Sequence, residues 1–471
     1  MSGLFGSLTQ TVRALSAHSK GVETAGRNIA NVNNPDYARQ RVLFADRGTV
    51  NTPQGAQSLG IEAKAVEQVR DALLDTQVIR ERGRTATLEA EGTVLLRIQA
   101  SLGESINRAA ALDDVTAGGL ATSVTEFFNA FQALAARPTD LGERQNLLQR
   151  SAQLTERFNV TSERLTQVDQ DVDVEIATEV EETNRLLSSI ATLNSQIGRM
   201  EINALGTAVD LRDKRLSEIE KLSDVMAVET QVNAGAPSQV DVFIRDSAGD
   251  PVSLVNLATV TSSVSFDGNQ LVAGTAATPL QLNGGSVQGL LAVRDGPLAD
   301  LRTGLDTLAN QLATAVNATY NPTGATGDFF TINSADPAES LGLAAGLTPT
   351  SVKTSDGGSA GDNTLALAVS ELANQTFAIA DGDLIDGTFI QSYSSLVSDL
   401  GRAVAGTESR LEDQTLIESL VREQRLAMSG VSLDEEMTDL MKYQRAFEAS
   451  SRIVSIVDGL LDIVINRLGR G

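Results

Sequence analysis

The sequence predicts a mainly α-helical protein with a β-rich insert: a coiled-coil stalk made of the terminal helices, an elongated helical bundle and a small outer β domain. Apolar residues recur at three- and four-residue steps near both ends and through most of the middle. The pattern changes to alternation of two over one central stretch. Aromatic residues are only 4% of the 471 residues, which suits long helices packed through Leu, Val, Ile and Ala.

The N-terminal segment carries a heptad pattern of apolar residues. Its positions follow three- and four-residue steps, and only Ser19 and Gly26 among them are not apolar. Such spacing is typical of the seam of a coiled-coil helix. The apolar members of this seam are Phe5, Leu8, Val12, Leu15, Val22 and Ile29.

A matching stripe lies at the C-terminal end. Ser432 and Glu435 have the spacing of a capping box, which predicts that a helix starts there. No helical neighbour in the sequence covers either terminal helix, so we expect the two ends to pair with each other or with other subunits. The apolar members of the C-terminal stripe include Leu433, Met437, Leu440, Phe447, Val454, Leu461 and Ile465.

Breaks in the pattern predict three nested domains. Pro138 and Asp140 interrupt a long helical region, and alternation of apolar and polar residues begins near 229. A Gly-, Ser- and Asp-rich stretch follows the next helical region. The expected domains are a terminal coiled-coil domain with an extended connector (1–58 and 432–471), a helical bundle (59–228, 287–320 and 389–431) and an outer β-rich insert (229–286 and 321–388).

Composition and charge exclude several classes of function. The 37 Lys and Arg residues against 61 Asp and Glu residues give a net charge of −24, which repels phosphate backbones and anionic lipids. We therefore expect neither nucleic-acid binding nor membrane insertion. The absence of cysteine rules out disulfides and thiolate sites. The first residues lack the basic and apolar regions of a secretory signal peptide.

The sequence offers no catalytic, cofactor-binding or metal-binding residues. His18 is the sole histidine, and a lone helical histidine is more often a solvated side chain than a pH switch. Asp169, Asp171 and Asp173 imitate the start of a calcium loop, but Val stands where that motif needs Gly and Glu. We expect these carboxylates to be surface groups, and we expect no enzyme activity.

Two terminal segments resemble the flagellar rod, hook and hook-associated axial proteins. Gly26–Gln40, with Asn31 and the ending Tyr37-Ala-Arg39-Gln40, is similar to the family's N-terminal signature and closer to its hook-associated members than to the hook protein. Asp36 stands where the family usually has Gly. Ser429–Phe447 resembles the C-terminal signature. Shorter similarities occur, in family order, at Phe127–Phe131, Arg144–Leu148, Asp210–Arg215 and Gly289–Leu291.

The resemblance implies a structural subunit at the junction between the flagellar hook and filament. It implies export without a cleaved signal peptide through the flagellar type III apparatus, and an extracellular location. The implied partners are further copies of the chain in a ring or helical assembly, the hook protein, hook-associated protein 3 and a cytoplasmic export chaperone. The assembly interface would combine the two terminal stripes with Asn31, Tyr37 and Arg39.

Two alternatives stay open at this point. The chain could be another axial protein of the same family, namely a hook, rod or flagellin-like subunit. It could also be a surface hydrolase on a helical stalk, which would need a catalytic constellation within 229–388, where the sequence shows none.

Overall fold

The predicted fold class is confirmed by the computed structural model, which describes residues 2–52, 55–103, 119–203, 205–324, 327–359 and 361–463. Helices dominate these ranges, and one larger sheet interrupts them. No helix within these ranges is both long and apolar enough to cross a membrane. The long helices are α1 (Ser2–Ala30), α2 (Ala72–Leu102), α3 (Leu120–Ala136), α4 (Leu141–Met200), α5 (Val209–Val225), α7 (Ala299–Tyr320), α10 (Phe389–Ser429) and α11 (Leu433–Asp462).

The chain forms two compact units. Unit 1 consists of Met1–Ala86, Glu179–Gly285 and Asp413–Gly471, and unit 2 consists of Thr87–Thr178 and Ser286–Glu412. The residues of α2, α4 and α10 are therefore shared between the units. The three domains expected from the sequence have other boundaries and stay a prediction.

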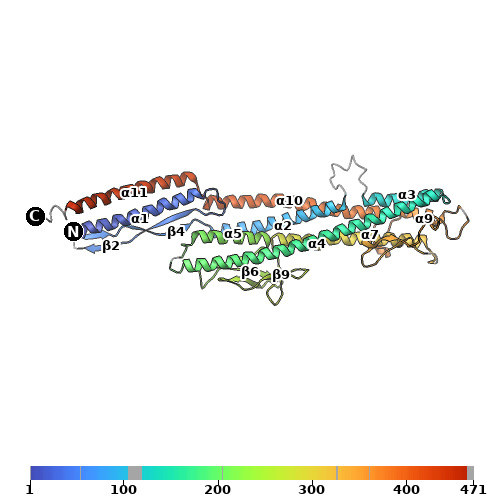
Figure 1. The fold of residues 1–471 in the computed structure, drawn as a ribbon, viewed down its shortest axis with the longest axis horizontal. Helices are drawn as coiled ribbons and strands as arrows, with labels where there is room; N and C mark the ends of the chain where they lie inside the picture. Colours follow the sequence, from blue (N-terminus) through green and yellow to red (C-terminus); the bar gives the residue numbers. More distant parts are fainter. Residues whose placement is uncertain are drawn as a thin grey trace. The chain divides into compact units, whose positions relative to one another are not determined.

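In unit 1 the terminal helices α1 and α11 lie side by side, as Figure 1 shows. Small residues make this close approach possible. Ala17, Gly21 and Ala25 are buried on α1, and Ser450 is buried on α11. A Cβ atom at Gly21 would lie 2.7 Å from Cγ of Tyr443, which is closer than atoms in contact can be. Small residues of α1 thus allow the close approach, while α11 contributes the ring of Tyr443 and also buries Val457 and Leu461.

A β-hairpin covers part of α1 in unit 1. Its strands β1 (Gln40–Asp46) and β4 (Ile61–Gln68) are antiparallel, and a second pair, β2 (Thr49–Thr52) and β3 (Gly55–Ser58), lies between them in the sequence. This differs from the extended connector expected up to residue 58. Gln40 and Val42 are both buried on the same face of β1. Because one of these inward positions is polar, the sequence lacks the alternation of apolar and polar residues that would predict a strand.

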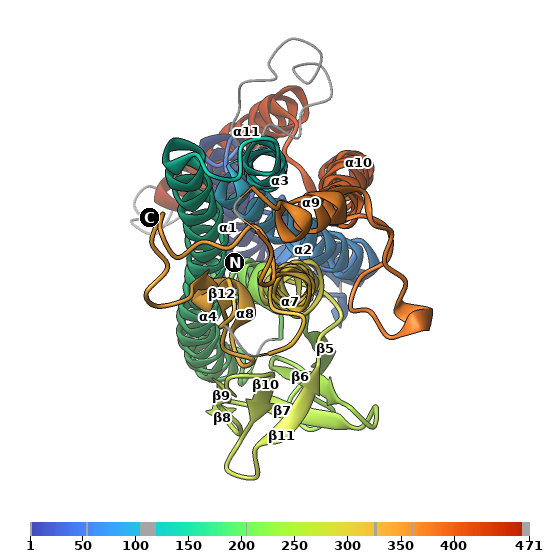
Figure 2. The ribbon, with the colours of Figure 1, turned by 90° about the vertical axis from the view of Figure 1, so that its right-hand side faces the viewer.

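The larger sheet of unit 1 is antiparallel, and Figure 2 shows its strands gathered together. Its order is β8-β7-β6-β11-β10-β9, with β5 paired to β6. Asn194 of α4 donates to the carbonyls of Val240 (2.7 Å) and Leu257 (2.6 Å), which fastens the sheet to the helix. The strands are β5 (Glu229–Val232), β6 (Val240–Asp246), β7 (Pro251–Asn256), β8 (Thr259–Val260), β9 (Val264–Phe266), β10 (Leu271–Ala273) and β11 (Thr278–Gln281).

Unit 2 has an aromatic core. The ring of Phe329 lies 5.3 Å from that of Phe131 and 5.2 Å from that of Tyr320, and Phe127 packs against Phe330 at 5.4 Å. Helix α9 packs against α3 and α7 (Figure 2). The shorter elements are α6 (Ser286–Val293), η1 (Arg294–Leu298), β12 (Phe330–Thr331), α8 (Pro337–Ser340), β13 (Gly342–Leu343), α9 (Thr364–Glu371), η2 (Leu372–Asn374) and η3 (Ile379–Asp381).

This arrangement differs from the expected place of 321–388 in an outer β-rich insert. The described part of that stretch contains two two-residue strands, and its other elements are short helices. Phe329 and Phe330 are fully buried among aromatic residues of α3, so they anchor the stretch to the helical core. The abundance of Gly, Ser and Asp around them conceals this anchoring role.

Helix α11 begins as predicted, but without the predicted capping box. Ser432 stands at the N-cap, yet its side chain makes no capping hydrogen bond, and its carbonyl accepts from the Glu436 amide at 3.0 Å. The Glu435 carboxylate instead accepts a hydrogen bond from Arg39 Nη1 at 2.6 Å. A partner from the other end of the chain therefore takes the place of the local cap.

Replacing Gly21 by Ala tests the close packing of α1 and α11. Alanine is the better helix former by about 1 kcal/mol, but its Cβ would press on the Tyr443 ring, so we expect a net loss of about 1–3 kcal/mol in local stability. Amide hydrogen exchange of the two helices measures this loss. Gly26→Ala in the same helix is the control, because nothing lies within 4 Å of its Cβ position and protection should rise. Equal protection in both variants would contradict the packing.

Candidate assembly site at the terminal helices

A buried asparagine joins both ends of the chain in unit 1. Asn28 is 1% exposed, and its Nδ2 donates to the Gln40 carbonyl and to Glu436 Oε2, both at 2.8 Å. Its Oδ1 accepts from the Tyr37 hydroxyl at 2.8 Å and from the Gln40 amide at 3.0 Å. Each polar atom of this amide is thus paired, as buried polar groups require. Helix α1, the following turn, β1 and α11 meet at this one side chain.

An ion pair completes the cluster. Arg39 Nε donates to Glu436 Oε1 at 2.7 Å, and the side chain of Glu436 is only 3% exposed. Burial raises the pKa of Tyr37, and the nearby Asp210 and Asp213 raise it further, so its hydroxyl stays protonated and can donate to Asn28. We call Asn28, Tyr37, Arg39, Gln40 and Glu436 the terminal polar cluster.

Helix α5 holds the terminal polar cluster from a second side. Gln40 Nε2 donates to Asp210 at 3.1 Å, and Asp213 accepts from Arg70 Nη2 at 2.5 Å and from Gln68 Nε2 at 2.7 Å. Burial raises the pKa of Asp213, while the charge of Arg70 opposes that rise. The carboxylates of α5 therefore fasten the N-terminal hairpin.

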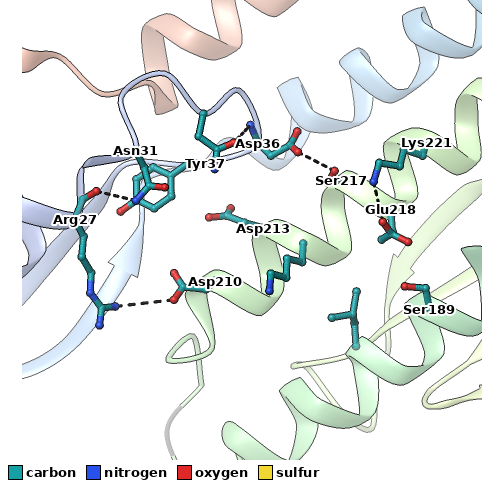
Figure 3. A pocket seen from close by; sticks show the side chains of 13 residues that line it. Arg27, Asn31, Asp36, Tyr37, Ser189, Asp210, Asp213, Ser217, Glu218 and Lys221 are labelled. Atoms are coloured by element: carbon teal, nitrogen blue, oxygen red, sulfur yellow. Dashed lines mark hydrogen bonds and ion pairs between the residues drawn. The ribbon is translucent and has the colours of Figure 1, made fainter. Parts of the chain in front are cut away.

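A groove of about 730 Å³ opens beside these residues, between the turn after α1, α5 and α4 (Figure 3). Two pairs of its charged groups are in contact. Arg27 lies 4.0 Å from Asp210, and Lys221 donates to Glu218 at 3.0 Å. Asn31 and Tyr37 lie at one end of the groove (Figure 3).

The large apolar residues of the two predicted stripes are not at the centre of the α1–α11 contact. Phe5 is 51% exposed, Val12 48% and Met437 47%. The structure leaves these three side chains on the outside of the helix pair. Leu433 and Phe447 are also exposed; Leu8, Leu15, Val22, Ile29, Asn31, Tyr37, Arg39, Leu440 and Val454 are partly exposed; Leu461 is buried; and Ile465 lies outside the described residues.

Part of this outer surface is hollowed. A groove of about 660 Å³ is lined by Val12 and Leu15 of α1, by Phe447 of α11 and by residues 63–66 of β4. Two predicted N-terminal residues and one predicted C-terminal residue therefore line one concave surface. A groove of this kind can accept an apolar ridge of another helix.

Sequence reasoning missed several residues of this region. Asn28 and Glu436 lie inside the two signatures, but a buried amide and a carboxylate that bridge the chain ends have no local pattern. Met441, Ile453, Ile456 and Leu460 add to the exposed apolar surface of α11. Met441, Ile453 and Leu460 stand one residue before or after a predicted stripe position, and Ile456 stands two residues after one; this proximity was the available signal.

His18 and two of the three aspartates considered in the sequence analysis contact other side chains in the structure. His18 is partly buried and its ring lies 6.2 Å from that of Phe44, so it is not the solvated side chain expected. Burial lowers the pKa of His18. In unit 2, Asp169 pairs with Arg302 at 2.7 Å and Asp173 with Arg294 at 2.8 Å.

Replacing Arg39 by Met tests the terminal polar cluster. The change leaves the buried carboxylate of Glu436 without its cation, which is expected to lower stability by about 3 kcal/mol. Denaturation followed by hydrogen exchange in α1 and α11 measures the loss. Arg41→Met is the matched control, because Arg41 is 64% exposed and lies 3.9 Å from its partner Glu67, so its loss should stay below about 0.5 kcal/mol. Adding Glu436→Gln to Arg39→Met should recover part of the lost stability, because the buried group is then neutral. Equal stability of the Arg39→Met and Arg41→Met variants would contradict the role given to the Arg39–Glu436 ion pair.

Comparison with known proteins covers both units. Residues 109–329 match the family model described as flagellar hook-associated protein FlgK helical domain, and residues 422–468 match the flagellar basal body rod FlgEFG protein C-terminal model. Flagellar hook-associated protein 1 of Bacillus subtilis is 27% identical over the whole of both chains. That of Escherichia coli is 24% identical over 98% of this chain and 99% of its own.

A solved structure shares the fold. The flagellar hook junction protein FlgK from Burkholderia pseudomallei superposes with a TM-score of 0.61, at 15% identity, over 75% of this chain and 100% of its own. The family models, the end-to-end similarity and the fold agree with the two terminal signatures. The chain is thus similar, from end to end, to flagellar hook-associated protein 1.

Proposed function

We propose that this protein, a structural subunit of the flagellar junction between hook and filament, assembles through the outer faces of its paired terminal helices. The observation that carries the mechanism is the position of the large apolar side chains. Phe5, Val12, Leu433 and Met437 are each about half exposed, although α1 and α11 are already paired. Large apolar side chains that stay exposed together on one surface are typical of protein–protein interfaces.

The free energy for assembly comes from this surface. Removing apolar surface from water contributes roughly 25 cal/mol per Å², and each copy offers residues from both helices and the groove beside Phe447. Small side chains hold the pair together, so the large ones are available for neighbouring copies. The terminal polar cluster, with Arg39 and Tyr37, fixes the register of α1 against α11.

Finer assignments extend this proposal. We infer that the neighbours are further copies of the chain, the hook protein and hook-associated protein 3, and that an export chaperone binds the chain in the cytoplasm. Export without a cleaved signal peptide would place the subunit outside the cell. The full-length similarity to hook-associated protein 1 favours this position over that of a hook, rod or flagellin-like subunit. A structural family also favours a role without catalysis over a stalked hydrolase.

A strain without the gene tests the cellular role. We expect normal hooks, no attached filaments and filament subunits released into the medium, because filament growth would lack its junction. Electron microscopy of the cells and analysis of the medium provide the measurements. Restoring the gene on a plasmid is the control, and normal filaments on the deletion strain would contradict the role.

Phe447→Asp tests the assembly surface. Phe447 is 37% exposed in the single chain, so its replacement should lower the stability of the subunit by only about 1–3 kcal/mol and leave the rest of the fold intact. In the assembly the same carboxylate would be buried without a partner, at a loss of several kcal/mol per copy. The variant should therefore appear folded in the medium and be absent from purified flagella.

Glu448→Lys is the matched control for this experiment. It changes the adjacent exposed residue, which is rotated by about 100° around the helix. It should be incorporated into flagella nearly as well as the unchanged chain. Incorporation of Phe447→Asp at the same level would mean that the outer stripe is not the assembly surface.

A further inference from the structure

Arg215 of α5 is a buried cation with neutral partners. It is 7% exposed, and its Nη1 donates to Asn194 Oδ1 at 2.8 Å and to the Ser238 carbonyl at 2.9 Å. No carboxylate of the described residues forms an ion pair with it. Its neighbour Arg212 is different, because it binds Glu201 through Nε at 2.8 Å and Nη2 at 2.6 Å.

The buried position affects the pKa of Arg215. Burial lowers this pKa to about 10, the positive charge of Arg212 contributes to the decrease, and the Glu201 carboxylate opposes it. A guanidinium in such a position is stabilised by any carboxylate that reaches it, and it is well shaped to bind one through two hydrogen bonds.

Arg215 lines a groove in unit 1 that is open to solvent. The groove has a volume of about 520 Å³, and its lining includes the cations Arg70 and Arg212 and the carboxylates Glu67 and Asp75. Leu205 also lines it and is 61% exposed, and Met200 and Ile202, which precede Leu205 in the sequence, are 59% and 75% exposed. We call this surface the Arg215 groove. It combines a cation that lacks a carboxylate with an apolar rim, so it fits a ridge that carries both apolar groups and carboxylates.

The part of α10 that belongs to unit 1 presents such a ridge. Leu416 and Leu420 are 61% and 50% exposed, and the steps of three and four residues from Asp413 to Glu423 place all four side chains on one face. The opposite face is fixed inside the unit, where Arg425 is buried and bonded to Glu220. We call Asp413, Leu416, Leu420 and Glu423 the α10 ridge.

We propose that the α10 ridge of one copy docks in the Arg215 groove of the next copy. The leucines would cover the apolar rim, and Asp413 or Glu423 would supply the carboxylate that Arg215 lacks. The two surfaces consist of different residues, so the contact is heterologous and repeats from copy to copy, as a ring or helical assembly requires. This inference rests on the proposed function, because it needs copies that are already held together by their terminal helices.

Engineered cysteines test the contact directly, since the chain has no cysteine of its own. Cells that co-express Leu205→Cys and Leu420→Cys copies should yield flagella in which mild oxidation links residue 205 of one copy to residue 420 of another. Mass spectrometry of the linked peptides identifies the pair. We expect at least tenfold more of this product than from the control pair Leu205→Cys and Leu141→Cys, because Leu141 is equally exposed, at 57%, but belongs to unit 2.

A charge change tests the role of the carboxylates. Combining Asp413→Lys and Glu423→Lys with Leu420→Cys should lower the yield of the 205–420 product at least threefold. Glu163→Lys in place of both changes is the control, since this exposed residue lies in unit 2. An unchanged yield would overturn the ionic part of the contact and with it the assignment of Arg215.

The remaining outcomes separate this inference from the proposed function. If both cysteine variants are present in purified flagella but no 205–420 product forms, the groove contact is wrong and assembly through the terminal helices stands. Links between two copies of residue 205 would show a symmetric contact and overturn the inference as well. If the unchanged chain is itself absent from flagella, both proposals fail.

Discussion

The arrangement of the terminal helices depends on one buried asparagine. Asn28 binds the hairpin through Gln40 and α11 through Glu436, so the two ends of the chain share a register that neither end specifies alone. Leaving such groups unpaired in the interior costs roughly 1–3 kcal/mol each, which penalises a shifted register. Tyr37 donates to Asn28 Oδ1, and Arg39 donates to the other oxygen of the Glu436 carboxylate, so a shifted register would lose these bonds as well. The outer surface can have a defined shape only because this inner register is fixed.

A division of roles between small and large side chains follows from that register. Ala17, Gly21 and Ser450 allow the backbones to approach, while Phe5, Val12 and Met437 remain outside. A pair held through its large apolar residues would have little left to offer to a neighbour. The subunit instead uses close packing and hydrogen bonds within the helix pair and leaves several large apolar side chains on its outer surface.

Much of the fold could be predicted from periodicity. The break between α3 and α4, the start of the sheet at Glu229 and the starts of α10 and α11 lie where the pattern changes. The face through which the terminal helices touch could not be predicted in this way, because a hydropathy pattern marks large apolar residues and passes over Ala, Gly and Ser. The anchoring of residues 321–388 was missed for a similar reason. Two phenylalanines decide it, and they stand in a stretch whose composition resembles a loop.

The hydrogen bond between Asn28 and Glu436 also affects the order of folding, because its two residues are 408 positions apart in the chain. Closing a loop ten times longer adds about 2 kcal/mol of entropy cost, and contacts so distant in sequence form late and slowly. A chain from which α11 is missing cannot make this contact at all, because Glu436 lies in that helix. The register of the two terminal helices is therefore acquired last, and only when both ends of the chain are present.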